Sequence, residues 1–113
     1  MDINEYLQKH KVIELLCGEY SIRKVAPRVK CQDGFSMSVQ VGEYAYCLPR
    51  ENNAYTYTQV EVGYPSEREE LLDEWVERWD DNEPDWTRSV YGYVPIEVVD
   101  KIIEKHGGYK EEE

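Results

Sequence analysis

The sequence is poor in the residues that metal sites and many enzymes use. Its 113 residues include two histidines and three cysteines, Cys17, Cys31 and Cys47, with no C-x-x-C pair among them. Structural zinc sites usually take their ligands from closely spaced pairs, so a zinc site here would need single ligands scattered along the chain. We interpret the cysteines as free thiols in a reducing compartment and expect neither a metal nor a cofactor.

The motifs of the common enzyme classes are missing as well. The chain contains no P-loop, no G-x-G-x-x-G, no H-E-x-x-H and no G-x-S-x-G. His10 and His106 lie beside lysines near the ends of two expected helices, and we expect both to be exposed and without function. The sequence therefore predicts a protein that is not an enzyme, with a cysteine-dependent enzyme as the weakest alternative.

Long apolar runs are also absent. The longest uncharged ones, such as AYCLP, fall far short of the roughly 18 to 20 residues that cross a bilayer, and residues 1–11 contain no apolar signal-peptide core. With 41% hydrophobic and 33% charged residues, the chain is expected to fold as one soluble, cytoplasmic domain without membrane contact. We expect this domain to span residues 1–108 and to be followed by a frayed acidic tail, 109–113.

Negative charge is concentrated in the second half of the chain. Residues 1–50 carry seven Lys/Arg against six Asp/Glu, whereas residues 51–113 carry six against eighteen. The halves thus have net charges of +1 and −12, which together give the formal charge of −11. Such an asymmetry bears on partners and on association rates and not on the fold. The negative net charge also disfavours direct binding of nucleic acid.

Two local patterns predict the N-terminal half. Asp2 as an N-cap and apolar residues at helical spacing predict a helix over residues 3–17, although the run KVIELL within it fits a strand equally well. From Ser21 the period becomes two, and Asp33-Gly34 is a dipeptide that suits a tight hairpin turn. Val29 and Cys31 are expected to share one face of the first strand, and one face of the second strand is expected to hold Phe35, Met37, Val39 and Val41.

The C-terminal half predicts further strands and helices. AYTYTQVEVGYP predicts a strand over residues 55–62, and SVYGYVP predicts one over residues 90–94, followed by a helix that Gly107 and Gly108 end. With the acidic helix described next, the pattern predicts an α+β fold. We expect a small, mainly antiparallel sheet of three or four strands with about three helices packed on it.

The segment SEREELLDEWVERWDDNEPD, residues 66–85, carries ten acidic side chains and two arginines. Ser66 and Glu69 form the S-x-x-E capping box of a helix that is expected to run to about Trp79. Its buried stripe would consist of Leu71, Leu72, Trp75, Val76 and Trp79. The acidic residues expected to bind a partner, on the opposite face and in the following loop, are Glu70, Asp73, Glu74, Glu77, Asp81, Glu83 and Asp85.

The charge spacing on this expected helix is similar to that of nucleic acid. Eleven rises of about 1.5 Å between residues 70 and 81 span about 16 Å, so five charges lie about 3 Å apart. One strand of B-DNA carries a phosphate about every 3.4 Å. The row would therefore fit a basic nucleic-acid groove; the alternative interpretation is an acidic face that is only solvated.

Aromatic residues add possible contact area. The chain has ten tyrosines, of which Tyr55 and Tyr57 would share one face of a strand, and Trp86 lies in the acidic loop beside Pro84. We expect Tyr55, Tyr57 and Trp86 to act as partner-binding anchors. Cross-strand packing on a half-buried sheet is the alternative use of the tyrosines.

Three stretches within residues 28–108 carry a resemblance, namely GFSMSVQVGEYAYCLPREN, YTQVEVGYPSE and VYGYVPIEVVDKIIEKHGG. They resemble short proteins carried by phages and mobile elements of gut bacteria. In size and acidity the chain is also similar in kind to small anti-CRISPR proteins, several of which block a Cas nuclease by imitating nucleic acid. This resemblance implies a Cas nuclease as partner, the bacterial host cytoplasm as location, and the acidic residues above as the mimic surface.

The leading hypothesis is a non-enzymatic inhibitor of a nucleic-acid-binding host defence protein. Its acidic helix would occupy the basic nucleic-acid groove of that protein. The alternative is an interaction or assembly module of a mobile element, a homodimer joined through exposed tyrosines, in which the acidic face serves only solubility.

Overall fold

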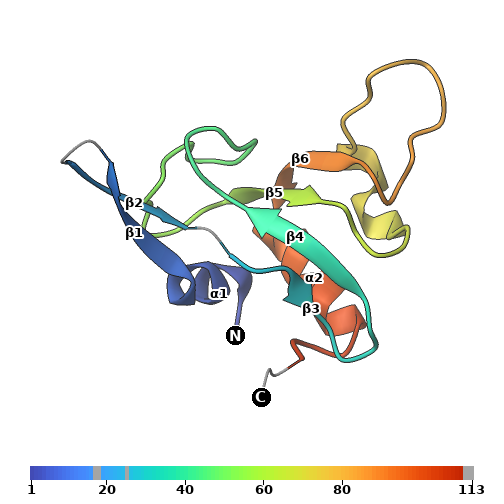
Figure 1. Ribbon diagram of the computed structural model, residues 1–113. Helices are drawn as coiled ribbons and strands as arrows, with labels where there is room; N and C mark the ends of the chain where they lie inside the picture. The colour runs from blue at the N-terminus through green and yellow to red at the C-terminus, as the bar shows by residue number, and fades with distance from the viewer. Residues whose placement is uncertain (17–18, 25, 111–113) are drawn as a thin grey trace.

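A computed structural model describes residues 1–16, 19–24 and 26–110 (Figure 1). The elements along these residues are α1 (Ile3–Lys9), β1 (Lys11–Leu16), β2 (Glu19–Lys24), β3 (Val29–Lys30), β4 (Ser36–Gln40), β5 (Gln59–Gly63), the 3-10 helix η1 (Glu70–Trp75), β6 (Val90–Pro95) and α2 (Ile96–Lys105). The described strands form a four-stranded antiparallel sheet in the order β3-β4-β5-β6 and a two-stranded hairpin, β1-β2. The predicted α+β class is confirmed.

The N-terminal helix is shorter than expected. Asp2 caps it as predicted, because its carboxylate accepts a hydrogen bond from the Glu5 backbone N–H at 2.8 Å. The helix ends at Lys9 and not at residue 17, because residues 11–16 pair with β2 as an antiparallel strand. The strand alternative for KVIELL is therefore the correct one, and its β-branched residues favour it. The β1-β2 hairpin points away from the larger sheet (Figure 1), and Cys17 lies outside the described residues.

The predicted hairpin around Asp33-Gly34 is confirmed. β3 and β4 pair with Val29 opposite Met37. Gly34 has a φ of 96°, a left-handed conformation that glycine adopts without a steric penalty. The Asp33 carboxylate accepts a hydrogen bond from the Phe35 N–H at 2.9 Å, which closes the turn. The residues predicted to share a face within each strand are all buried: Val29, Cys31, Phe35, Met37, Val39 and Val41.

The strand expected over residues 55–62 begins later, at Gln59. The reason is Asn4 of α1, whose side-chain amide forms hydrogen bonds with the backbone N–H and carbonyl of Tyr57. The Asn4 amide accepts from the Tyr57 N–H at 2.8 Å and donates to the Tyr57 carbonyl at 3.0 Å. The Tyr57 side chain is fully buried, and its hydroxyl donates to the Glu51 carbonyl at 2.5 Å. Tyr57 is therefore a core residue, and its expected role as a partner-binding anchor is wrong.

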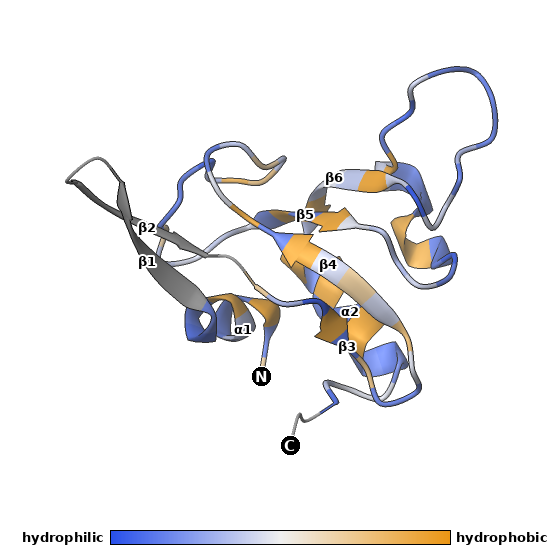
Figure 2. Ribbon diagram, viewed as in Figure 1, coloured by the Kyte–Doolittle hydropathy of each residue, from blue (hydrophilic) through white to orange (hydrophobic). Residues whose placement is uncertain are grey.

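The helix α2 covers one face of the four-stranded sheet and closes the core. It follows β6 directly, with Pro95 at the N-cap, and it ends before Gly107 and Gly108 as the sequence predicts. The hydrophobic positions of β4 and α2, orange in Figure 2, lie on the two sides of this contact. The core they enclose includes Val29, Met37, Val39, Val60, Val62 and Val94 of the sheet and Val99, Ile102 and Ile103 of α2.

The chain after α2 runs beside β3. Tyr109 forms an antiparallel bridge with Cys31, and the Lys110 N–H donates to the Lys30 carbonyl at 2.8 Å. The Tyr109 ring also stacks on Tyr6 of α1, with 5.1 Å between the ring centroids. Residues 109 and 110, which were expected to fray, are thus held by the fold, whereas residues 111–113 lie outside the described residues.

Candidate protein-binding surface

The acidic segment 66–85 does not form the expected helix. Its helical part is η1, a six-residue 3-10 helix that ends at Trp75. Val76 is then extended, with φ −63° and ψ 133°, and it pairs with Tyr91 of β6. The Glu77 N–H donates to the Val90 carbonyl at 2.8 Å. The backbone therefore bonds to the edge of the sheet where a helix would have continued, and the expected straight row of five charges does not form.

The expected apolar stripe is only partly buried as a result. Leu72 is fully buried, and Leu71, Trp75 and Val76 pack half-buried against the core. Trp79, which a helix would have placed on the same stripe, is 90% exposed. Because the 3-10 helix ends at Trp75 and Val76 is extended, the helical repeat no longer decides which side chains face the core.

η1 begins after Glu69 and not at Ser66. The Ser66 hydroxyl accepts a hydrogen bond from the Ser36 N–H of β4 at 2.9 Å, so the predicted capping box is absent here. Glu69 takes the N-cap position instead, because its carboxylate accepts from the Leu71 N–H at 3.3 Å. Glu69 is only 2% exposed, and a buried carboxylate is stable only with charged or hydrogen-bonding partners.

Those partners come from the end of α2 and from the β3–β4 turn. Glu69 Oε1 lies 2.7 Å from Lys105 Nζ, and Glu69 Oε2 lies 2.6 Å from His106 Nε2. The second ring nitrogen of His106, Nδ1, lies 2.6 Å from Asp33 Oδ2. The imidazole also stacks on the Phe35 ring, with 4.1 Å between the centroids. We refer to Asp33, Glu69, Lys105 and His106 as the charge cluster.

The expectation that His106 is exposed is therefore wrong, since its side chain is only 8% exposed. Both of its nitrogens face carboxylate oxygens, so both donate only when the ring is an imidazolium. Burial by itself lowers the pKa of His106, but the hydrogen bonds to Glu69 and Asp33 outweigh burial and raise it. Conversely, burial by itself raises the pKa of Glu69, but the hydrogen bonds from Lys105, His106 and the Leu71 N–H lower it. The cluster thus favours an imidazolium between two carboxylates.

A second ion pair ties η1 to the chain that follows it. Arg68 Nη2 lies 2.8 Å from Asp73 Oδ2. The Arg68 guanidinium also lies 4.2 Å from the centroid of the Trp86 ring, a cation–π contact. Asp73 is therefore neutralised within the molecule, and Trp86 is half-buried against the core. Both side chains are thus partly engaged within the molecule, and their predicted role in partner binding stays a prediction.

The chain between η1 and β6 projects from the end of the sheet as a long loop (Figure 1). We define this acidic loop as residues 77–89; most of it is hydrophilic in Figure 2. Its base is held by two hydrogen bonds, from the Ser89 hydroxyl to the Asp85 carbonyl at 2.7 Å and from the Tyr91 hydroxyl to the Trp86 carbonyl at 2.6 Å. Its exposed outer part consists of Arg78, Trp79, Asp80, Asp81, Asn82 and Glu83.

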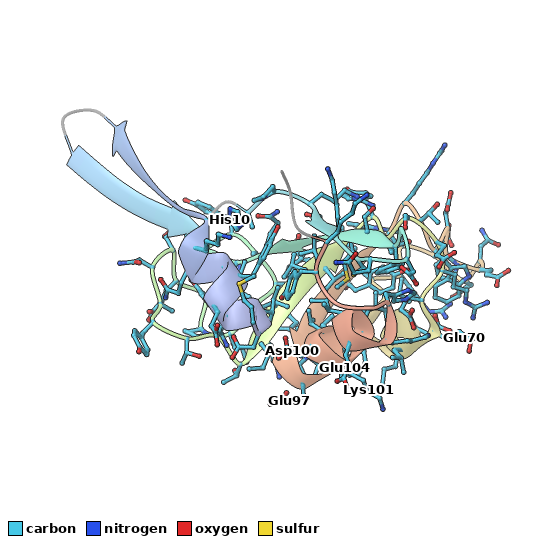
Figure 3. The ribbon with its side chains drawn as sticks, turned by 90° about the horizontal axis from the view of Figure 1, so that it is seen from below. His10, Glu70, Glu97, Asp100, Lys101 and Glu104 are labelled. Carbon is cyan, nitrogen blue, oxygen red and sulfur yellow. The ribbon has the colours of Figure 1, made fainter. Side chains whose placement is uncertain are left out.

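The acidic residues predicted to bind a partner differ in exposure. Glu77 is half-buried, and its Oε1 lies so close to Gly92 that a Cβ added to that glycine would be 2.5 Å away. Glu70 projects from η1 at the end of the molecule opposite His10 (Figure 3). The exposed members of the predicted set are Glu70, Glu74, Asp81, Glu83 and Asp85.

The exposed tyrosines lie elsewhere. Tyr55 is 92% exposed, but its carbonyl accepts from Gln8 Nε2 of α1 at 2.9 Å, and α1 lies at the opposite end of the molecule from the acidic loop (Figure 1). Tyr44 is 89% exposed, and Tyr46 beside it contacts the Tyr93 ring at a centroid distance of 5.9 Å. The structure therefore does not bring Tyr55 together with the predicted acidic residues.

The described cysteines are buried and do not have the environment of reactive thiolates. Burial, and after it the charge of Asp33, raises the pKa of Cys31 to about 11. Burial also raises the pKa of Cys47. Both thiols are thus protonated at neutral pH, whereas a nucleophilic cysteine needs a lowered pKa.

Sequence reasoning missed Glu69, Asp33 and His106 as a unit. His106 is 37 positions from Glu69 and 73 from Asp33, and no local motif links them. Among the described residues, no group of three or more His, Cys, Asp or Glu side chains is arranged to hold a metal ion. Nor does any helix in the described part of the chain combine the length and apolarity that a membrane span needs. No family model matches the sequence, and no curated protein or solved structure is significantly similar to it.

Proposed function

We propose that the protein is a non-enzymatic binding protein whose acidic loop docks on the basic surface of a nucleic-acid-binding protein and competes there with nucleic acid. The observation that carries this proposal is Trp79, a tryptophan with 90% of its surface exposed, followed directly by Asp80 and Asp81. Tryptophan is among the residues that most often dominate binding energy when a partner buries them. A large aromatic side chain followed by two carboxylates suits a partner that offers an apolar pocket with a cationic rim.

Charge supports the same type of partner. The acidic loop contains five Asp/Glu and two Arg, a net charge of −3. Its one internal ion pair, Arg88 Nε to Asp85 Oδ2 at 3.8 Å, joins two largely exposed side chains, and such pairs contribute little. Most of the negative charge on the loop is therefore directed at solvent, where it accelerates association with a positively charged surface.

The rigid base of the loop favours binding without a large ordering penalty. The loop starts from η1, which the charge cluster and the Arg68–Asp73 pair hold, and it returns through the hydrogen bonds of Ser89 and Tyr91. A surface held in place before binding loses less conformational entropy on association.

The resemblance to small anti-CRISPR proteins makes a Cas nuclease one candidate for the partner within this proposal. The basic groove would be met by a loop with an aromatic residue, and not by the straight acidic helix that the sequence predicts. The raised thiol pKa values argue against Cys31 and Cys47 as nucleophiles of a cysteine-dependent enzyme.

The test is displacement of labelled nucleic acid from a panel of purified bacterial nucleic-acid-binding proteins that includes guide-loaded Cas nucleases. We expect the wild-type protein to displace nucleic acid from at least one member. Trp79→Ala should weaken that effect by a factor of about 30, equivalent to about 2 kcal/mol. The triple variant D80K/D81K/E83K should weaken it further and reduce its salt dependence.

A matched control reverses the same number of charges elsewhere, in E51K/E97K/E104K. These three glutamates are exposed and lie outside the acidic loop; Glu97 and Glu104 project from α2 in Figure 3. If both triple variants weaken displacement equally, only the net charge matters and the loop is not the site. Displacement from no member of the panel would refute the proposed competition.

A second candidate, self-association, is favoured by one specific observation. Tyr44, Tyr46 and Leu48 lie close together in the sequence and are 89%, 40% and 42% exposed. A homodimer would bury them, and light scattering across a concentration series would detect it. The variant Y44S/L48S should then be monomeric, while a monomeric wild type at high concentration would exclude this candidate.

A further inference from the structure

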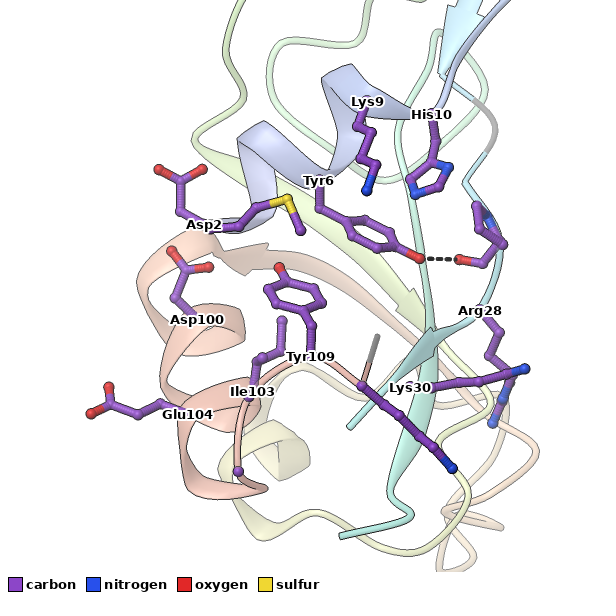
Figure 4. Close-up of a pocket in the computed structure, with 15 residues that line it drawn as sticks. Asp2, Tyr6, Lys9, His10, Arg28, Lys30, Asp100, Ile103, Glu104 and Tyr109 are labelled. Carbon is purple, nitrogen blue, oxygen red and sulfur yellow. Dashed lines mark hydrogen bonds between the residues drawn. The ribbon is translucent and has the colours of Figure 1, made fainter. Parts of the chain in front are cut away.

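A pocket of about 940 Å³ opens at the other end of the molecule from the acidic loop, between α1, the end of α2 and β3 (Figure 4). Volumes of about 300 to 1,000 Å³ are typical of small-molecule sites. Its wall contains the stacked rings of Tyr6 and Tyr109, and the Tyr6 hydroxyl donates to the Pro27 carbonyl at 3.1 Å. These contacts join α1 to Pro27, which precedes β3, and to Tyr109, which lies beside β3. The fold therefore holds the shape of the pocket.

The pocket concentrates positive charge in an acidic protein. Of the thirteen Lys/Arg in the chain, four line it, and His10 lies among them: the cationic residues are Lys9, Arg28, Lys30 and Lys110. In the close-up, Lys9, Lys30 and Arg28 lie on one side of the two tyrosine rings (Figure 4). Within the described part of the chain, Lys9 and Lys110 form no ion pair. Like charges that line one pocket disfavour one another, and a bound anion would offset that repulsion.

The guanidinium of Arg28 is fixed at the rim. It donates from Nε to the Ser36 hydroxyl at 2.8 Å, and from Nη2 to the carbonyls of Ser36 and Tyr64. Arg28, which also lines the pocket, is therefore a positive charge that hydrogen bonds to the chain hold in place.

The opposite side of the pocket is acidic. Asp2, Asp100 and Glu104 lie there, on the other side of the tyrosine rings from Lys9 and Lys30 (Figure 4). Asp2 accepts from the Glu5 N–H and Asp100 from the Ile3 N–H, each at 2.8 Å. These bonds hold the carboxylates in place, and each carboxylate has further lone pairs with which to accept hydrogen bonds from a ligand.

We propose that this pocket binds a small organic phosphomonoester. The dianionic phosphate would be held on the cationic side of the pocket, whose lining includes Lys9 and Lys110, whereas a carboxylate, with a single charge, would be attracted less strongly. The hydroxyl or amino groups of the ligand would donate to Asp2 and Asp100. Lysine is a common phosphate ligand because its ammonium group is a compact charge with three donors.

The first arm of the test measures binding by calorimetry with the 113-residue chain and four probes. Adenosine 5′-monophosphate and ribose 5-phosphate are expected to bind, inorganic phosphate to bind at least tenfold more weakly, and adenosine not to bind. Failure of both phosphorylated organic probes at 10 mM would overturn the proposal. Equal affinities for inorganic phosphate and ribose 5-phosphate would overturn the assignment of an organic ligand.

The second arm uses variants that separate the two sides of the pocket. K9A/K110A should weaken ribose 5-phosphate binding at least tenfold, while K101A, an exposed lysine of α2 outside the pocket lining, should not change it. Asp2→Asn keeps a side chain able to cap α1 and should weaken ribose 5-phosphate without affecting inorganic phosphate. Single variants K9Q and K110Q replace the double variant if it fails to fold. Unchanged affinity in the lysine variants, or an equal loss in K101A, would overturn the site.

The chain itself supplies a further check, because Glu111, Glu112 and Glu113 follow Lys110 directly in the sequence. Their three negative charges oppose an anion near Lys110. A chain ending at Lys110 should therefore bind ribose 5-phosphate several-fold more tightly than the full chain. Weaker binding by the shortened chain would contradict a phosphate position beside Lys110.

Discussion

Replacing His106 with glutamine is expected to destabilise the protein in a way that depends on pH. The imidazolium makes two contacts of 2.6 Å, to Glu69 and to Asp33, and Glu69 is 2% exposed. Removing one partner of a buried ion pair typically costs about 3 to 5 kcal/mol, because a buried charge loses its compensation. Lys105 remains 2.7 Å from Glu69, so we expect the lower end, about 3 kcal/mol. For a domain of this size the loss corresponds to a melting temperature lower by about 12 °C.

The pH dependence follows from the directions of the pKa shifts. The pKa of His106 is raised in the folded protein, so its contribution is complete below the unfolded value of 6.5 and is lost as pH rises through the folded pKa. The pKa values of Glu69 and Asp33 are lowered, so their contributions are present above the unfolded values of 4.5 and 3.8 and are lost as pH falls through the folded ones. The cluster therefore stabilises the fold most between about pH 4.5 and 6.5.

The assay is urea unfolding followed by tryptophan fluorescence at pH 5.5 and pH 8.5. The difference in unfolding free energy between wild type and His106→Gln should be about 3 kcal/mol at pH 5.5 and clearly smaller at pH 8.5. His10→Gln makes the same replacement outside the charge cluster and serves as the matched control. An equal difference at both pH values, or a pH-dependent loss in the control as large as in the variant, would refute an imidazolium held between two carboxylates.

Three further predictions concern packing and chemistry. Asn4→Ala removes the amide that bonds to the backbone N–H and carbonyl of Tyr57, and it should lower the unfolding free energy in urea by about 2 kcal/mol. The control Asn53→Ala, at an exposed position, should change it by almost nothing. Equal losses in the two variants would contradict the role of Asn4. Gly92→Ala places a Cβ 2.5 Å from Glu77 Oε1 and 3.2 Å from Tyr46 Cβ and should lower the unfolding free energy by about 1 to 3 kcal/mol, while Gly63→Ala, whose Cβ would lie 4.0 Å from Ser38 Cβ, should be milder. Cys31 is 1% exposed and has a pKa of about 11, so it should react with iodoacetamide at pH 8 far more slowly than free cysteine. Peptide mass spectrometry would measure the labelling. Complete labelling of Cys31 in the native protein at the rate of free cysteine would contradict its burial.

The sequence predicts correctly those turns, caps and helix ends that residues close together in the chain determine. The Asp33-Gly34 turn, the Asp2 cap and the end of α2 at Gly107 each depend on residues within a few positions of one another. The hairpin register follows from that turn, and the alternation on either side of it identifies the buried face. These features are correct in the structure because no distant contact competes with them.

Non-local pairing decides the elements that the sequence pattern misplaces. Leu71, Leu72, Trp75, Val76 and Trp79 have helical spacing, yet Val76 bonds to the edge of β6, fifteen positions away at Tyr91. The acidic face that a longer helix would have formed is self-repelling, so the helix gains little from its own side chains. Residues 55–58 do not join the expected strand for the same reason, because the Asn4 amide bonds to the backbone of Tyr57.

The sequence does not locate the candidate site correctly, because burial and pairing are also non-local. The pattern predicts a capping box of Glu69 with Ser66, although the Glu69 carboxylate lies against Lys105 and His106. The pattern also predicts a solvated face that includes Asp73, although Arg68 neutralises this carboxylate. A sequence gives the number of charges in a segment, whereas the fold decides which of them have internal partners.

The position of the charge cluster links the two proposed binding regions physically. On one side, Glu69 is the N-cap of η1, and the acidic loop begins where η1 and its extension at Val76 end. On the other side, His106 is followed directly by Gly107 and Gly108, whose chain leads to Tyr109 and Lys110 in the wall of the pocket. Since the Asp33 N–H also donates to the His106 carbonyl at 3.2 Å, the β3–β4 turn fixes the same point through both backbone and side chain. A protonated His106 therefore holds the N-cap of η1 and the end of α2 against one turn, and its loss would release both of these contacts together.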